Sequence, residues 1–228
     1  MISFNNLGNL GRLANQMFQY AATRGIAASK GYEFIIPESN FQNEWSDHQL
    51  FDAFKLTGLK KTGYVEGNYY KEPDNHSHIY LEDFVNQCPD NVSLFGYFQT
   101  EKYFKHIEDD IREDFTFHDK ILNPCLDAFN FDEVISLHVR RTDYLKPQHS
   151  AHHGQCSLEY YEEALNQFDS KIPVLIFSDD TEWCKQQEIF KPDRFLISET
   201  ESNLMDMCLY LILQQRMLVV WCLFQNNI

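Results

Sequence analysis

The chain has 228 residues, of which 43% are hydrophobic and 23% charged, and this composition excludes a largely disordered protein because it supplies enough apolar side chains for a core. The length fits one large domain or two domains of roughly a hundred residues each. The formal net charge of −15 would repel the phosphates of nucleic acids, so we expect no nucleic-acid partner.

The ends of the sequence carry no targeting or membrane signal. Residues 1–6 lack the basic stretch and apolar run of a signal peptide. The longest apolar region, residues 204–224, is interrupted by Asp206 and by residues 214–216, so we expect no transmembrane segment. These features predict a cytoplasmic protein, with peripheral contact to a membrane as its only membrane association. The six cysteines form no short-spaced pair, and we expect them to be free thiols.

The first half of the chain alternates helical and strand-like patterns. Residues 15–29 predict a helix because their apolar side chains fall on one face, and Gly31 predicts its end. Residues 31–37 predict a strand that ends at a proline. Residues 92–99 predict a second strand, and residues 101–115 predict a helix whose run of acidic side chains forms a solvated face.

The second half of the chain alternates strands and helices more regularly. Strands are predicted at 134–141, 173–177 and 195–198, with helices at 157–168 and 181–187 between them. This alternation is typical of an α/β protein with a doubly wound parallel sheet. Pro124 lies near the expected boundary, so we predict an N-terminal domain, 1–128, and a C-terminal domain, 129–228. Ligands of such sheets bind beyond the carboxyl ends of the strands.

Two arginines end the strand predicted at 134–141. Adjacent strand residues point to opposite faces, so Arg140 and Arg141 cannot do the same job while the strand is regular. One could face a cleft and bind paired phosphate oxygens, while the other pairs with Asp143. An ordinary surface salt bridge explains the same residues equally well.

Acidic residues follow the next strand, at Asp179 and Asp180. An N-cap with acids in the first helical turn explains both, together with Ser178. Alternatively, Asp179 accepts hydrogen bonds from a guanine base or a ribose. A metal-binding role is the weakest reading because no acidic cluster has recognisable ligand spacing, so we predict no metal site.

A glycine-containing turn, residues 8–16, precedes the first predicted helix. Glycines before a helix let the backbone approach a ligand, and helix N-terminal amides favour anions. The spacing fits neither a phosphate-binding loop nor a dinucleotide fingerprint. By itself this turn therefore carries little information.

Taken together, these segments resemble glycosyltransferase family 11, the α-1,2-fucosyltransferases, and more distantly the wider fucosyltransferase superfamily. The matching pieces occur in the family's order and cover the chain from about Leu7 to about Leu209. They are residues 11–21, 96–104, 138–144 and 177–180, together with Trp183 and Cys184.

The resemblance implies a GT-B type fold of two Rossmann-like domains, with GDP-fucose held mainly by the second domain. The implied activity is an inverting, metal-independent transfer of L-fucose from GDP-fucose to the 2-hydroxyl of a terminal galactose on a glycan. No cofactor is expected besides this donor substrate. The implied partners are GDP-fucose and a galactose-terminated glycan.

The resemblance also implies roles for individual residues. Arg140 would contact the β-phosphate of the leaving GDP, replacing a divalent cation. Arg141 and Asp143 would shape the motif, and Asp143 is also a weak candidate for the general base. Asn15 would face the reacting centre. The further substrate-binding residues would be His138 and Asp179 on the guanosine side and Gly11, Arg12 and Gln16 in the glycine turn.

The chain departs from the family pattern in three respects, the first being that no general base is evident besides the weak candidate Asp143. Ala14 stands where the family usually has glycine, a small change. Beyond Leu209 the family's expected serine-rich segment is absent, so we interpret residues 210–228 as an atypical tail, frameshifted or truncated, that leaves the second domain incomplete. A catalytically inactive GDP- or carbohydrate-binding remnant is the alternative function, and a transferase for another nucleotide sugar is a third.

Overall fold

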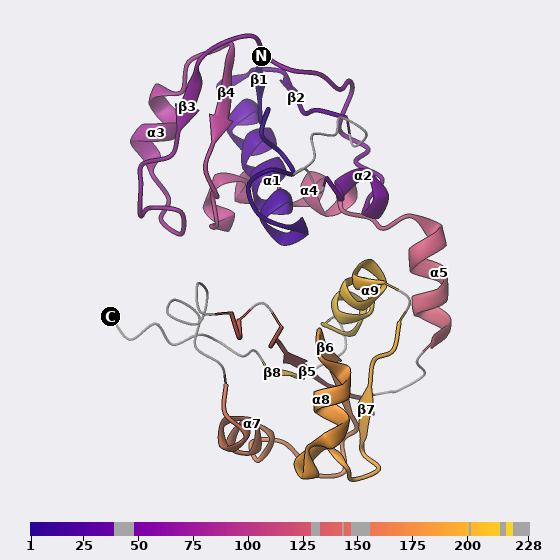
Figure 1. Cartoon of the computed structure of the whole chain (residues 1–228). Coiled ribbons are helices and arrows are strands. Elements are labelled where there is room, and N and C mark those ends of the chain that lie inside the picture. The colour runs from indigo at the N-terminus through magenta and orange to yellow at the C-terminus, as the bar shows by residue number, and fades with distance from the viewer. Residues whose placement is uncertain are drawn as a thin grey trace. The chain divides into compact units, whose positions relative to one another are not determined.

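The structure, a computed structural model, describes residues 1–38, 48–128, 133–142, 144–146, 156–200, 202–214 and 218–220. The chain divides into two compact units, Met1–His118 and Asp119–Ile228 (Figure 1). We predict the division after residue 128 from the sequence, but in the structure it lies after His118, so the helix Asp119–Ala128 belongs to the second unit. Both units combine helices with a parallel sheet, as an α/β protein requires.

The first unit is built on a four-stranded sheet in the order β2-β1-β4-β3, and all of its pairings are parallel. The strands are short: β1 Ile2–Ser3, β2 Phe34–Ile35, β3 Tyr69–Lys71 and β4 Val92–Phe95. The central strands β1 and β4 are almost completely buried, as expected where helices cover a parallel sheet.

The helices of the first unit are α1 Leu13–Lys30, α2 Leu50–Ala53, α3 Glu82–Gln87 and α4 Glu108–Asp114, with 3-10 turns at η1 Glu101–Tyr103 and η2 Lys105–Ile107. The prediction for α1 is confirmed, including Gly31 as its left-handed C-cap. The single helix predicted at 101–115 is wrong, because η1 and η2 precede α4. These turns bury the Tyr103 side chain, whose ring lies edge-on to Phe98 at 5.4 Å.

The prediction of a solvated acidic face is wrong at Asp114. Its side chain is fully buried and forms an ion pair with Arg24. It also accepts hydrogen bonds from the Tyr20 hydroxyl at 2.6 Å and from the Gly58 backbone N–H at 2.6 Å. Burial and this carboxylate raise the pKa of Tyr20, so the phenol stays a donor. The sequence could not distinguish Asp114 from its solvated neighbours because its partners are far away in the chain.

The second unit is also built on a four-stranded parallel sheet, in the order β7-β6-β5-β8. The strands are β5 Ile135–Val139, β6 Val174–Ser178, β7 Phe195–Ile197 and β8 Leu218–Val220. The three predicted strands are therefore confirmed. β8 lies within the tail that we expected to be atypical, and it pairs with β5.

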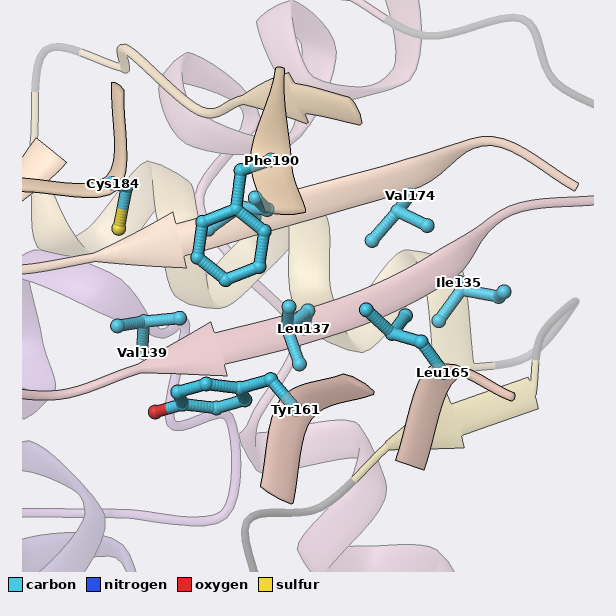
Figure 2. Close-up of a cluster of buried hydrophobic side chains, with 9 residues drawn as sticks. Ile135, Leu137, Val139, Tyr161, Leu165, Val174, Cys184 and Phe190 are labelled. Atoms are coloured by element: carbon cyan, nitrogen blue, oxygen red, sulfur yellow. The ribbon is translucent and has the colours of Figure 1, made fainter. Parts of the chain in front are cut away.

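The helices of this unit are α5 Asp119–Ala128, α7 Leu158–Leu165, α8 Thr181–Gln186 and α9 Asn203–Gln214, with a 3-10 turn at η3 Glu188–Phe190. α5 belongs here because it packs against α9, where the Cys125 thiol donates to the Met205 carbonyl at 3.6 Å. The core lies between β5 and β6 on one side and α7 on the other, with Tyr161 and Leu165 facing the apolar side chains of β5 (Figure 2).

The cysteines follow the prediction only in part. Four of the described cysteines are buried free thiols, namely Cys88, Cys125, Cys184 and Cys208. Cys156 is disulfide-bonded, contrary to the expectation that all six are free. Sequence spacing could not show this, because a disulfide depends on which distant segments the fold brings together. In the described part of the chain, every helix is too short or too polar to cross a membrane.

Candidate active site

The loop after β5 is held by the residue that follows the neighbouring strand, β6. The Asp179 carboxylate accepts hydrogen bonds from the Arg141 backbone N–H at 2.8 Å and from the Thr142 backbone N–H at 3.2 Å. It also accepts from the Thr142 hydroxyl at 2.6 Å. β5 and β6 are parallel, so their carboxyl ends meet at one edge of the sheet, and this is why Asp179 reaches the loop.

Arg141 turns toward the start of α8. Its Nε donates to Asp180 Oδ2 at 3.1 Å, and its guanidinium lies 3.8 Å from the centre of the Trp183 ring. Asp180 also accepts from the Trp183 backbone N–H, so its interpretation as the N-cap is confirmed. Arg141 thus pairs with Asp180, and the predicted pairing with Asp143 stays a prediction. Asp143 itself lies outside the described residues.

Arg140 and His138 lie on the other side of the same segment. The Arg140 guanidinium is 4.7 Å from the centre of the Tyr144 ring, a cation–π distance. The pKa of His138 lies below its usual value, first because surrounding atoms restrict the hydration of the ring and second because the Arg140 charge repels a proton. The negative charges of Asp179 and Asp206 partly offset this by raising the pKa of His138. The two arginines therefore have different surroundings, although both lie beyond the end of β5 at Val139.

An open pocket of about 540 Å³ lies beyond the carboxyl ends of β6 and β7. Its lining is polar and includes Asp179, Lys185, Ser198, Glu199, Thr200 and Asp206. Asp206, on α9, accepts hydrogen bonds from the Ser198 hydroxyl at 2.6 Å and from the Thr200 hydroxyl at 2.8 Å. A ligand with several N–H and O–H donors would find carboxylate and hydroxyl acceptors here.

The sequence analysis predicted Asp179 among the pocket residues but missed most of the others, including Ser198, Thr200 and Asp206. A usable signal existed, because Ser198 ends a predicted strand, Thr200 follows it, and Asp206 lies in a segment that fits the family pattern. Within the described ranges, no three His, Cys, Asp or Glu side chains are grouped to hold a metal ion. Metal independence stays a prediction.

The glycine turn of the first unit brings Gly11 against Asn15. Gly11 has φ +88°, and a Cβ at this position would lie 2.3 Å from Asn15 Nδ2, so only glycine fits. Arg12 is the exposed N-cap residue of α1. Asn15 is partly exposed in the first turn of α1, and its Oδ1 accepts a hydrogen bond from Gln99 Nε2 at 2.7 Å.

The two glutamines of this motif are buried. Gln16 has no exposed surface, and its Oε1 accepts from the Gln49 backbone N–H at 2.9 Å. Gln16 thus connects α1 to the start of α2, and its role in substrate binding stays a prediction. Gln19, which the sequence analysis did not single out, donates from Nε2 to the Leu10 carbonyl at 2.8 Å and to the Gly96 carbonyl at 3.1 Å. It thereby joins the glycine turn to the loop after β4.

Comparisons with known proteins agree with these motifs. The sequence model of the family described as glycosyl transferase family 11 matches residues 2–224, which continues past Leu209 into the segment interpreted as a tail. The O-antigen biosynthesis glycosyltransferase WbnK of Escherichia coli is 31% identical, over 87% of this chain and 81% of that protein. An alpha-1,2-colitosyltransferase of Escherichia coli is 28% identical, over 79% of this chain and 71% of that protein.

Mammalian proteins match less of their length. Galactoside 2-alpha-L-fucosyltransferase Sec1 of Mus musculus is 24% identical over 77% of this chain, but the match spans 50% of that protein. The family match covers nearly the whole chain, and it includes both the glycine turn and the arginine-containing segment. The chain belongs to glycosyltransferase family 11.

Proposed function

We propose that this protein transfers L-fucose from GDP-fucose to the 2-hydroxyl of a terminal galactose, with inversion and without a metal ion. The family and the names of the mammalian relatives support a fucosyl donor and a galactoside acceptor. In this proposal the two units are the two Rossmann-like domains of a GT-B enzyme, and the second unit binds the donor.

The observation that carries the proposal is the arrangement at the carboxyl edge of the second sheet. A polar pocket, lined by Asp179 and Asp206, lies beyond β6 and β7, and Arg140 follows the adjacent strand β5. Carboxylates and hydroxyls suit the N–H donors of guanine and the hydroxyls of ribose. A guanidinium suits the diphosphate, which is the other end of the same ligand. This division of charge matches a nucleoside diphosphate sugar.

Arg140 would supply the main chemical effect. As the bond to the sugar breaks, negative charge grows on the β-phosphate, and a fixed guanidinium stabilises that charge more in the transition state than in the ground state. Asn15 of the first unit would contact the reacting centre. Asp143 is the candidate base on sequence grounds alone.

A second donor is supported by one relative, the alpha-1,2-colitosyltransferase of Escherichia coli. The pocket residues would hold the nucleotide in either case, so they do not discriminate between the two sugars. A donor screen does. The purified protein is offered GDP-fucose, a GDP-colitose donor and UDP-sugars with galactosides, and free nucleotide is measured with and without EDTA.

The critical variant is Arg140→Ala. We expect the unmodified protein to transfer fucose from GDP-fucose at a rate that EDTA does not change. In Arg140→Ala we expect kcat to fall at least a hundredfold. Arg112→Ala, which removes an exposed arginine of α4, is the charge-matched control and should retain full activity. Near-normal kcat in Arg140→Ala contradicts the role of Arg140. GDP binding without transfer by the unmodified protein favours the inactive remnant instead.

A further inference from the structure

The loop after β4, residues Gly96–Gln99, has an unusual backbone. Gly96 has φ +157° and Phe98 has φ +51°, a left-handed conformation that a bulky side chain rarely adopts. Phe98 is nevertheless fully buried, with its ring 5.7 Å from Phe84 and 6.3 Å from Phe4. Such strained conformations persist only where the surroundings over-determine them, and they concentrate at functional sites.

Two buried side chains hold this loop. Glu72, which follows β3 and is 8% exposed, accepts from the Tyr97 backbone N–H at 2.8 Å and from the Phe98 backbone N–H at 3.1 Å. Gln19 of α1 donates to the Gly96 carbonyl at 3.1 Å. A Cβ on Gly96 would lie 2.5 Å from the Glu72 Cβ, so the carboxylate and the loop are in close contact. The direction in which residue 99 leaves the loop is therefore fixed.

What this rigid loop presents is the Gln99 side chain. Gln99 is exposed, and its Nε2 donates to Asn15 Oδ1 at 2.7 Å. A carboxamide has one oxygen acceptor and one NH₂ donor. With its oxygen engaged by Gln99, Asn15 has its Nδ2 group left to offer to a ligand. In this arrangement the loop positions Gln99, and the Gln99 hydrogen bond sets the polarity of Asn15.

We propose that Gln99 is a positioning residue, which orients the Asn15 carboxamide so that its Nδ2 donates a hydrogen bond to an oxygen atom of the substrate. This inference rests on the proposed function, which puts Asn15 at the reacting centre. Gln99 itself acts through Asn15. The pair differs from an ordinary surface hydrogen bond, because one partner extends from a loop strained and braced on its buried side and the other from the first turn of α1.

The test compares two substitutions of Gln99 that differ in polarity. Gln99→Met keeps the length of the side chain and removes the hydrogen bond, so Asn15 can rotate. We expect kcat to fall about tenfold, the factor that corresponds to one hydrogen bond. Gln99→Glu can only accept, so it should turn Asn15 Nδ2 toward itself and present Oδ1 to the substrate. We expect kcat to fall about a hundredfold.

Further measurements separate positioning from a purely structural role. The KM for the nucleotide donor and the melting temperature should stay unchanged in both variants, because Gln99 is exposed. Gln87→Glu, at an exposed position of α3, adds the same charge elsewhere in the unit and should behave as the unmodified protein. Equal kcat losses in the two Gln99 variants, or unchanged kcat in both, would overturn the proposal.

Asn15→Ala separates this inference from the proposed function. If it abolishes transfer while both Gln99 variants remain fully active, the function stands and the positioning role is wrong. If Asn15→Ala retains full kcat, the role of Asn15 in the proposed function is wrong, and the role of Gln99 is overturned with it.

Discussion

In both units a carboxylate hydrogen-bonds to the backbone of a functional loop, but the two carboxylates differ in burial. In each, a carboxylate that follows one strand accepts from backbone amides of the loop after the neighbouring parallel strand. Glu72 follows β3 and holds the loop after β4, while Asp179 follows β6 and holds the loop after β5. Glu72 is buried, whereas Asp179 is exposed and lines a pocket.

The difference in burial gives these two loop-binding carboxylates different roles. A buried carboxylate that bonds backbone amides can only stabilise the loop, and it is costly to remove because the amides lose their partner out of reach of water. An exposed carboxylate costs less to remove, since water replaces it, but it can also accept hydrogen bonds from a ligand. The glycosyltransferase should thus respond in opposite ways to the loss of Glu72 and of Asp179.

The largest expected effect on stability is that of Glu72→Ala. It leaves the N–H groups of Tyr97 and Phe98 without their acceptor beside a strained backbone, so we expect the free energy of unfolding to fall by about 2–4 kcal/mol. Urea denaturation followed by fluorescence measures this. Glu66→Ala, at an exposed position of the same unit, should change the value by less than about 0.5 kcal/mol. If the two variants are equally stable, the buried carboxylate is not what holds the loop.

The reverse pattern is expected for Asp179→Ala. The Arg141 and Thr142 amides can bond to water, so the free energy of unfolding should fall by about 1 kcal/mol or less. Transfer should drop at least tenfold in kcat/KM, because the pocket loses an acceptor and the loop that follows Arg140 loosens. The control is Asp193→Ala, at an exposed position outside the pocket. Full activity in Asp179→Ala would make this carboxylate as purely structural as Glu72.

The smallest effect concerns two histidines, one in each unit. Burial lowers the pKa of His48, whereas His138 is exposed and its pKa is lowered by restricted hydration of the ring and by the Arg140 charge. Below the unfolded pKa of about 6.5 the unfolded chain binds the proton more readily, so stability should fall as the pH drops from 6.5 toward the folded pKa and be constant above that window. His48→Phe should flatten part of this decline without loss of stability at pH 7, because both ring nitrogens of His48 lack a partner among the described residues.

The free energy of unfolding of the unmodified protein and of His48→Phe, measured at pH 7.5 and at pH 5.5, tests this prediction. His78→Phe, at an exposed position, should leave the pH dependence unchanged. A decline in His48→Phe as steep as in the unmodified protein would show that burial of this imidazole contributes nothing to the acid sensitivity.

Much of the second unit could be predicted from local pattern. Strands β5, β6 and β7 are short apolar runs bounded by polar residues, and the N-cap at Asp180 follows from its place between a strand and a helix. Other features could not be read in this way. Asp114 and Asp110 share one acidic run and both pair with Arg24, yet Asp114 is buried and Asp110 exposed, because Tyr20 and Gly58 bond Asp114 from distant parts of the chain.

The sequence alone determined the alternation of strands and helices and the motifs that identify the family, because hydrophobic periodicity, capping and turn residues act between near neighbours in the chain. Tertiary structure decided which motif side chains are buried and which reach the surface, since Gln16 is fully buried while the adjacent Asn15 is partly exposed. It also decided that Gln99 meets Asn15 and that Asp206 joins the pocket. These outcomes depend on which carboxyl ends of parallel strands meet at one sheet edge, a long-range property that local sequence does not encode.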